Sequence, residues 1–287
     1  MRSDNEGAGL VPAQACTVSA LFDLSGRVAL VTGALGILGR HFCRGLAECG
    51  ASLVVADLDA AEAERFAAEL QTDHGQPCLG LGCDVSDEAS VEAMVAHAVK
   101  TLGGIDILHN NAATKARDLE AFFAPAEDYT LAQWRDVMAV NLDGVFLVSR
   151  AVGGQMIKQG RGGSIIHTGS IYGEMGCDPR IYEGSQYLGV AINTPPVYAA
   201  SKAGVSGLAR YLATLWAGHG IRVNTLVPGG IESGQNAAFV ERYSARVPLG
   251  RMGAPTDLVG ALIFLASDAS GYVTGQTLHV DGGLSAW

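Results

Sequence analysis

The chain has 287 residues, of which 48% are hydrophobic, and it carries a formal net charge of −10 at pH 7. This length and apolar content are enough for one large α/β domain with a full core. The acidic balance, with its few basic residues scattered along the chain, disfavours a nucleic-acid or anionic-membrane partner.

Residues 1–20 precede the first predicted strand. The stretch MRSDNEGAGLVPAQAC has acids and glycines where a signal sequence has its apolar core, so we expect a flexible leader. The six cysteines form no CxxC pair, which predicts reduced thiols in a cytoplasmic protein. The seven histidines are dispersed, so no metal site is expected. No apolar run approaches the roughly 20 residues that span a bilayer.

From residue 26 onward, short β-branched runs alternate with stretches of helical period. This alternation predicts one α/β domain over residues 21–287, with a parallel sheet and helices on both faces. The predicted strands are 27–32, 52–56, 78–83, 105–109, 164–168, 222–227 and 277–280. The predicted helices are 37–49, 60–72, 87–102, 131–158, 197–218 and 256–267. Residues 112–129 and 171–197 lack a clear period.

A glycine-rich turn, TGALGILG, lies between the first strand and the first helix, with glycines at Gly33, Gly36 and Gly39. Residues without a Cβ let backbone amides and the positive end of a helix approach a pyrophosphate. The turn therefore predicts a nucleotide cradle. The alternative is a turn that merely lets helix and strand pack closely.

An acid, Asp57, ends the second strand. A carboxylate at this place accepts hydrogen bonds from the ribose hydroxyls of NAD and repels the additional phosphate of NADP. Neither Leu35 nor Leu58 offers that phosphate a positive charge, so NAD is preferred over NADP. Asp59 is the competing candidate, but it also suits the N-cap of the next helix.

Tyr198 and Lys202 are four positions apart in a predicted helix and therefore share one face. A nearby ammonium favours the phenolate, so we expect Lys202 to lower the pKa of Tyr198 and to make it a usable general acid/base. The alternative is a buried tyrosine beside a lysine that reaches to solvent.

The other motifs in the sequence decide between these two interpretations of Tyr198 and Lys202. From about Leu21 to Trp287 the sequence resembles the short-chain dehydrogenase/reductase family, whose fold is a single doubly wound Rossmann-type α/β domain with a seven-stranded parallel sheet. The matching motifs, in family order, are TGALGILG (32–39), CDV (83–85), NNAA (110–113), VNLDG (140–144), TGSIYG (168–173), YAASK (198–202) and VPGGIES (227–233).

The resemblance implies a catalytic tetrad of Asn141, Ser170, Tyr198 and Lys202. Ser170 would bind the substrate oxygen and Tyr198 would exchange the proton, while Lys202 would hold the nicotinamide ribose. Asn141 would hold a helix backbone and a water that relays protons. The alternative interpretation of Asn141 is an asparagine at a helix kink that takes no part in catalysis. The implied cofactor residues are Gly33, Leu35, Gly36, Ile37, Leu38, Gly39, Asp57, Leu58, Asp84, Val85, Asn110, Asn111, Ala112, Ala113, Tyr198, Lys202, Pro228, Gly229, Gly230, Ile231 and Ser233.

An insert, residues 171–197, separates Ser170 from Tyr198 and is longer than in the shorter family members. Both it and the TGxxGxxG spacing are similar to extended members that act on nucleotide-linked sugars. The insert residues suited to a polyhydroxylated ligand are Tyr172, Asp178, Arg180, Tyr182 and Glu183. The alternative for the insert is a surface loop or a subunit contact.

The leading hypothesis is an NAD-dependent oxidoreductase that acts on a CH–OH or C=O group of a sugar or sugar derivative, as used in bacterial surface-carbohydrate biosynthesis. A 3-oxoacyl-thioester reductase would share the same catalytic residues. A nonenzymatic NAD-binding sensor or scaffold is the alternative from another class. The resemblance further implies a homo-oligomer, either a tetramer or a dimer, with a small-molecule substrate.

Overall fold

A computed structural model of the protein describes residues 17–115 and 118–287. Of the leader predicted over residues 1–20, residues 1–16 lie outside the described residues. Its last residues form a short helix, α1 (Val18–Leu21), where the Thr17 side chain caps the first turn by accepting a hydrogen bond from the Ala20 amide.

The centre of the fold is a seven-stranded sheet with the strand order β3-β2-β1-β4-β5-β8-β9. All its strand pairs are parallel. The predicted fold class is confirmed, and each predicted strand is present to within two residues at either end. The strands are β1 (Val28–Thr32), β2 (Ser52–Asp57), β3 (Cys78–Gly82), β4 (Ile107–Asn110), β5 (Gly163–Thr168), β8 (Ile221–Pro228) and β9 (Thr277–Val280). The chain order reverses between β1 and β4, where open α/β sheets bind ligands.

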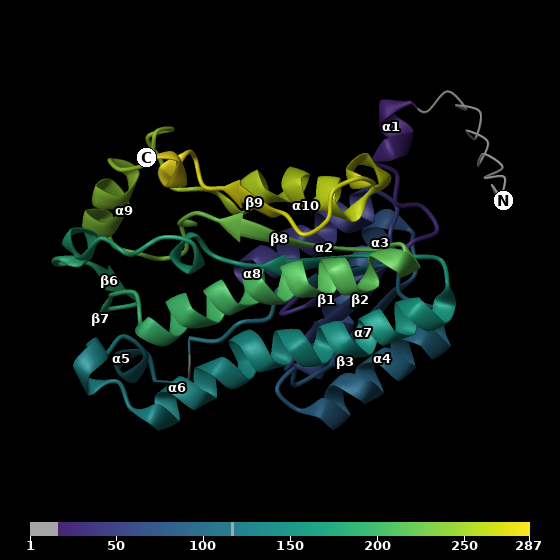
Figure 1. The fold of residues 1–287 in the computed structure, drawn as a ribbon, viewed down its shortest axis with the longest axis horizontal. Coiled ribbons are helices and arrows are strands. Elements are labelled where there is room, and N and C mark those ends of the chain that lie inside the picture. The colour runs from purple at the N-terminus through teal and green to yellow at the C-terminus, as the bar shows by residue number, and fades with distance from the viewer. Residues whose placement is uncertain (1–16, 116–117) are drawn as a thin grey trace, which may run out of the picture.

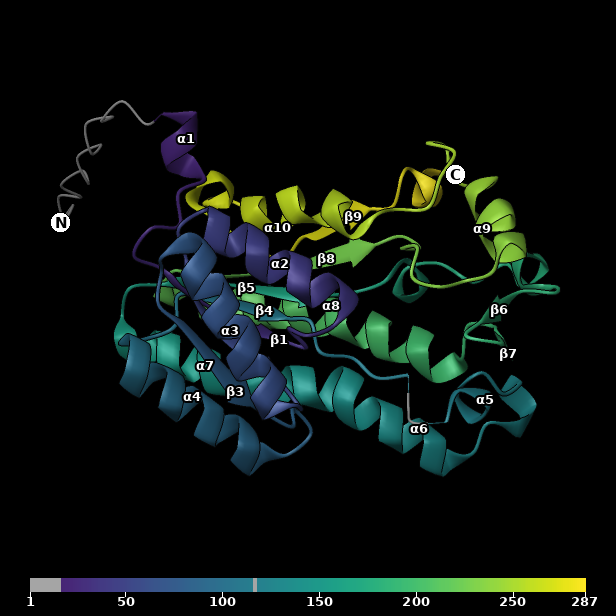
Figure 2. The ribbon, with the colours of Figure 1, turned by 180° about the vertical axis from the view of Figure 1, so that it is seen from behind.

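Helices cover both faces of this sheet (Figures 1 and 2). In β1, Ala29 and Val31 face one buried cluster, whereas Val28 and Leu30 face the other. The first face packs against α2 (Ile37–Glu48), α3 (Ala60–His74) and α10 (Val259–Ala266). The second packs against α4 (Glu88–Leu102), α7 (Val145–Gln159) and α8 (Pro196–Trp216). A strand buried on both faces explains the uninterrupted apolar run in its sequence.

The predicted helix over 131–158 is two helices in the structure. α6 (Leu131–Met138) and α7 are joined by π-type turns over Ala139–Gly144. By length and composition alone the stretch 131–159 could cross a membrane, which differs from the expectation that no apolar run is long enough to span a bilayer. In this fold it is a core element, because Val148 and Val152 of α7 are fully buried in a cluster with α4 and α8.

Short elements occupy the two segments that lack a period and the region after β8. They gather at one end of the molecule, beyond the carboxyl ends of the strands (Figures 1 and 2). They are α5 (Leu119–Phe122), β6 (Gln186–Tyr187), β7 (Val190–Ala191) and α9 (Ala237–Ser244). β6 and β7 pair as a hairpin whose two turn residues, Leu188 and Gly189, have φ values of 51° and 83°. Positive φ at both positions is the geometry of a tight two-residue hairpin turn.

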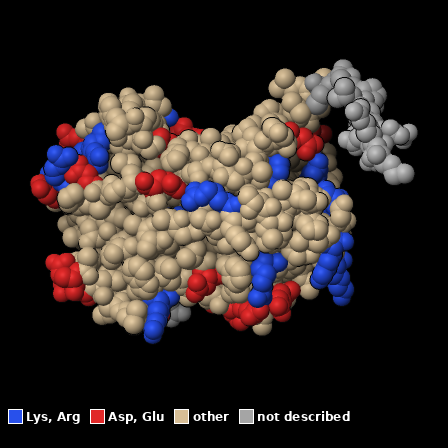
Figure 3. Space-filling view, viewed as in Figure 1, with Lys and Arg blue, Asp and Glu red and all other residues tan. Residues whose placement is uncertain are grey.

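Charged side chains are mixed on the surface. On the face shown in Figure 3, Lys and Arg are interspersed with Asp and Glu rather than gathered by sign. This face offers no broad basic surface of the kind that binds polyanions.

Two histidines on neighbouring strands, His109 of β4 and His167 of β5, are completely buried. The Thr168 hydroxyl donates its only proton to Asn111, so His109 Nε2, 2.9 Å from that hydroxyl, is the protonated nitrogen. Among the described residues, His109 Nδ1 has no hydrogen-bond partner, so a second proton there would be unsatisfied. Burial lowers the pKa to about 3 for His109 and to about 4 for His167.

We predict that the two histidines make the fold sensitive to mild acid. The unfolded chain takes up protons near pH 6.5 that the folded chain excludes, so their contribution is complete above that pH and is lost as the pH falls toward 4. The free energy of unfolding should fall with a slope of up to about 1.4 kcal/mol per pH unit for each histidine. Urea denaturation between pH 7 and pH 5 measures this slope.

The double variant His109→Gln/His167→Gln should flatten the slope in this range. The matched control is His97→Gln, since His97 is exposed on α4 and should leave the slope unchanged. An equally steep slope in the double variant would contradict the assignment.

Candidate functional site

A cleft of about 1160 Å³ runs along the carboxyl ends of the strands. The turn after β1, the end of β2 and the segment after β4 line one part of it. The end of β5, the insert, the start of α8 and the loop after β8 line the other. This volume accommodates a dinucleotide together with a small substrate.

The glycine turn leaves room for a ligand on its cleft side. Gly33 has a φ of 61°, and a Cβ there would lie 2.7 Å from the Cα of Ala112. Gly36 is the N-cap of α2, so free amides of the first helical turn face the cleft. Gly39, like Gly33, serves close packing, because a Cβ there would lie 2.2 Å from the Gly33 carbonyl oxygen. The turn thus fits a pyrophosphate at the free amides that follow Gly36.

Asp57 is fixed beside this turn by two backbone hydrogen bonds. The Leu35 amide donates to Oδ2 at 2.9 Å, and the Leu58 amide donates to Oδ1 at 2.8 Å. Each carboxylate oxygen keeps a further lone pair, so Asp57 can still accept hydrogen bonds from a ribose. Asp59 accepts from the Glu62 amide as the N-cap of α3, which is the alternative that the sequence left open for it.

An arginine next to this turn, Arg40, is already paired. Arg40 donates from Nε to the Leu35 carbonyl at 3.2 Å and from a terminal nitrogen to Glu62 at 2.7 Å. Its guanidinium is therefore neutralised by Glu62 rather than free for a phosphate at the ribose.

Most of the predicted cofactor residues line the cleft. These are Gly33, Leu35, Gly36, Ile37, Leu38, Asp57, Leu58, Asp84, Val85, Asn111, Ala112, Ala113, Tyr198, Pro228, Gly229, Gly230, Ile231 and Ser233. Gly39, Asn110 and Lys202 do not. Asn110 is buried and donates to the Val145 carbonyl at 3.2 Å and to the Ser149 hydroxyl at 2.9 Å, so it ties β4 to α7 instead.

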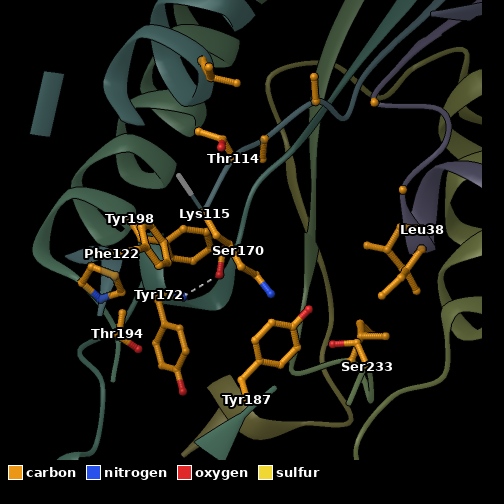
Figure 4. Close-up of a pocket in the computed structure, with 18 of the residues that line it drawn as sticks. Leu38, Thr114, Lys115, Phe122, Ser170, Tyr172, Tyr187, Thr194, Tyr198 and Ser233 are labelled. Atoms are coloured by element: carbon orange, nitrogen blue, oxygen red, sulfur yellow. Dashed lines mark hydrogen bonds between the residues drawn. The ribbon is translucent and has the colours of Figure 1, made fainter. Parts of the chain in front are cut away.

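Ser170 and Tyr198 lie next to each other on the wall of the cleft (Figure 4). Burial raises the pKa of Tyr198, and a hydrogen bond with Ser170 offsets part of that rise. Lys202 Nζ donates to the Thr168 carbonyl at 2.8 Å and lies 6.0 Å from the centroid of the Tyr198 ring. The expectation that Lys202 lowers the pKa of Tyr198 is therefore wrong for this structure. Burial instead lowers the pKa of Lys202, to about 8.

Asn141 is buried within the π-type turns and does not line the cleft. Its Oδ1 accepts from the Thr114 amide at 2.8 Å, and its Nδ2 donates to the Thr114 carbonyl at 3.4 Å. Asn141 therefore lies where the helix is irregular, as the alternative interpretation of a helix-kink asparagine predicts. Its amide also fixes the chain just after the NNAA motif.

The predicted substrate residues separate into two groups. Tyr172 and Tyr182 line the cleft, whereas Asp178, Arg180 and Glu183 do not. Asp178 is ion-paired with Arg180 at 2.7 Å and with Arg246 at 3.5 Å, and these bonds lower its pKa to about 2. Asp178 and Arg180 therefore neutralise each other. Because Asp178, Arg180 and Glu183 all lie outside the lining of the cleft, the structure does not support their placement at the substrate.

Other residues of the substrate end were not anticipated. They are Lys115, Phe122, Tyr187, Asn193, Thr194 and Gln235. The Tyr182 hydroxyl donates to the Tyr172 hydroxyl at 3.1 Å and lies 2.5 Å from the Thr194 hydroxyl. The chemistry of this wall is that of neutral hydroxyl groups, which bind other hydroxyl groups well. No motif includes these residues: all but Gln235 lie in the segments without a period, and Gln235 follows the VPGGIES motif by two residues.

Known proteins share this arrangement over nearly the whole chain. A family model described as enoyl-(acyl carrier protein) reductase matches residues 33–285. The chain is 38% identical over 279 residues to a D-threitol dehydrogenase of Mycolicibacterium smegmatis, covering 96% of this chain and 98% of that protein.

Solved structures are similar to this chain over nearly its whole length as well. One is a short-chain type dehydrogenase/reductase from Mycobacterium marinum, with 34% identity, a TM-score of 0.81, and coverage of 94% of this chain and 100% of that one. Another is a gluconate 5-dehydrogenase from Burkholderia cenocepacia in complex with NADP and tartrate. It has 37% identity, a TM-score of 0.83 and the same coverage of both chains.

Proposed function

Because the chain belongs to the short-chain dehydrogenase/reductase family, we propose that it transfers a hydride between NAD and a CH–OH or C=O group of a sugar-derived substrate. The observation that carries the proposal is the pair of hydroxyls, Ser170 and Tyr198, on one wall of a cleft whose other part holds the glycine turn and Asp57. The bound nicotinamide would supply the hydride acceptor or donor.

The chain's own residues bind the substrate oxygen and move its proton. Ser170 and Tyr198 both line the cleft and their side chains are hydrogen-bonded, so a carbinol oxygen beside them can bind to both hydroxyl groups. Tyr198 takes the proton in oxidation and returns it in reduction. Lys202 is largely protonated at neutral pH with a pKa of about 8, and its N–H groups would donate hydrogen bonds to the hydroxyls of the cofactor ribose. Asn141 acts as a positioning residue through Thr114.

A sugar-like substrate is supported by two observations. The relatives include proteins named for a polyol and for a sugar acid. The cleft wall formed by Tyr172, Tyr182 and Thr194 offers hydroxyl groups to such a ligand. A relative named 3-oxoacyl-(acyl-carrier-protein) reductase, 36% identical over 266 residues, supports the thioester reductase as the second candidate. The presence of Ser170, Tyr198 and Lys202 argues against a nonenzymatic NAD-binding sensor.

The substrate class is tested by turnover. With NAD, we expect oxidation of several four- to six-carbon polyols or sugar acids, followed as NADH absorbance. A 3-oxoacyl thioester with NADH or NADPH should react far more slowly. Turnover of the thioester alone would replace the proposal with the second candidate, and binding of NAD without any turnover would favour the sensor.

The preference for NAD rests on Asp57. Its carboxylate lies at the ribose end of the glycine turn, and both Leu35 and Leu58 beside it are uncharged. The Burkholderia relative is described with NADP, so relatives do not decide the choice for this chain. A role in surface-carbohydrate synthesis, a cytoplasmic location and a homo-oligomeric state stay predictions from the sequence.

We predict that kcat/KM is about tenfold or more higher with NAD than with NADP, and that Asp57→Asn reduces this ratio at least about tenfold. The reason is that the substitution removes both the acceptor for the ribose hydroxyls and the repulsion of the phosphate. Asp59→Asn is the matched control: asparagine caps a helix about as well as aspartate, so this variant should keep both the cap of α3 and the ratio. A native preference for NADP would contradict the assignment.

We further predict that Tyr198→Phe lowers kcat about 100-fold or more, because the proton carrier is lost while the ring still packs. The dissociation constant of NAD, measured by fluorescence titration, should change less than about threefold. Tyr211→Phe is the control on the same helix, since Tyr211 is exposed. A Tyr198→Phe enzyme with native kcat would refute the role of Tyr198.

A further inference from the structure

Lys115 is the one lysine or arginine that lines the cleft among the residues the structure describes. Every other charged side chain in that lining is a carboxylate: Asp57, Asp84, Asp118 and Asp136. In a protein with a net charge of −10, this is an unusual place for an unneutralised cation. An anionic ligand entering such a cleft needs a local positive charge to offset the field of the acids.

The ammonium of Lys115 lies over an aromatic ring. Its Nζ lies 3.9 Å from the centroid of the Tyr187 ring. Figure 4 shows the Lys115 side chain next to Ser170, with its nitrogen pointing into the cavity toward Tyr187. Every ion pair within the described part of the chain involves an arginine, so Lys115 is paired with no described carboxylate.

Tyr187 is itself fixed, because its hairpin is bonded to the loop before α9. The Gln186 amide donates to Asn236 Oδ1 at 3.2 Å, and the Asn236 amide donates to the Gln186 carbonyl at 3.0 Å. Tyr187 also forms a β-bridge with Gln235. The ring orients the ammonium, but an exposed cation–π contact is weak, so a carboxylate can compete for the three N–H donors.

The opposite wall is built for hydroxyl groups. Tyr182 donates its single proton to Tyr172, so in the contact between Tyr182 and Thr194 the Thr194 hydroxyl must be the donor. The chain of hydroxyls therefore ends on Tyr172, whose own proton is left to donate. A ligand that carries both hydroxyls and one carboxylate matches the two walls together.

We propose that Lys115 binds the carboxylate of the substrate, and that the preferred substrates are polyhydroxy acids rather than neutral polyols. This rests on the proposed function, because it names the substrate class of the same cleft. The neighbouring catalytic hydroxyls of Ser170 and Tyr198 would then act on a carbinol of the same molecule. Charge recognition at Lys115 adds a binding contribution that a neutral polyol of equal length lacks.

The test compares two six-carbon probes that differ in charge, D-gluconate and D-glucitol. With native enzyme and NAD, kcat/KM should be at least about tenfold higher for gluconate. Lys115→Met should raise the KM for gluconate about tenfold or more with a smaller change in kcat, and should change the KM for glucitol less than about twofold. Lys115→Arg should keep most of the preference, and Lys158→Met, an exposed lysine on α7, should change neither KM.

A binding measurement removes the dependence on turnover. Titration calorimetry of gluconate into the Tyr198→Phe enzyme saturated with NADH should show the same loss when Lys115→Met is added. An equal rise in KM for both probes would show that Lys115 only holds the hairpin, and no change for either would also overturn the proposal. Turnover of glucitol without gluconate would overturn it and leave the proposed function standing, whereas turnover of no sugar acid or polyol would remove the proposed function itself.

Discussion

The buried ammonium of Lys202 constrains the arrangement of the whole site. A charge inside a protein is stable only with a polar partner, and here the partner is the carbonyl of Thr168 at the end of β5. This bond sets the position of α8 relative to that strand. Ser170 follows Thr168 by two residues, and Tyr198 precedes Lys202 by one helical turn. The two hydroxyls that face the cleft are therefore placed by one hydrogen bond between the elements that carry them.

Thr168 also connects this half of the site to the cofactor half. Its hydroxyl donates to Asn111 Oδ1 at 3.2 Å, and Asn111 Nδ2 donates to the Gly33 carbonyl at 3.0 Å. The glycine turn, the NNAA segment and the end of β5 thus form one hydrogen-bonded frame. His109 is also part of this frame, because its Nε2 donates to the Thr168 hydroxyl. Since each of these groups is at least half-buried, displacing one leaves another unsatisfied, which keeps the two halves in register.

The sequence predicts those parts of the fold and of the site whose residues lie in periodic runs or in motifs. The strands are predictable because runs such as 28–32 are buried on both faces. Asp57 and Ser170 are predictable because motifs fix their places at strand ends. Lys115 and Tyr187 are not, because their contact joins two irregular segments and depends on how each folds. Asp178 and Arg180 mislead for a related reason: a charged residue in a loop can pair with its neighbour, and no pattern in the sequence shows which partner it takes.

The central claim is that the cleft transfers a hydride from a sugar carbinol to the nicotinamide while Tyr198 takes the hydroxyl proton. The most direct measurement is mass spectrometry of the reduced cofactor after turnover of a polyol or sugar acid that carries deuterium on its carbinol carbons. The account predicts that the deuterium appears in the NADH and not in water, with a slower rate than for the unlabelled substrate. Deuterium released into solvent, or oxidation without reduced nicotinamide, would contradict it.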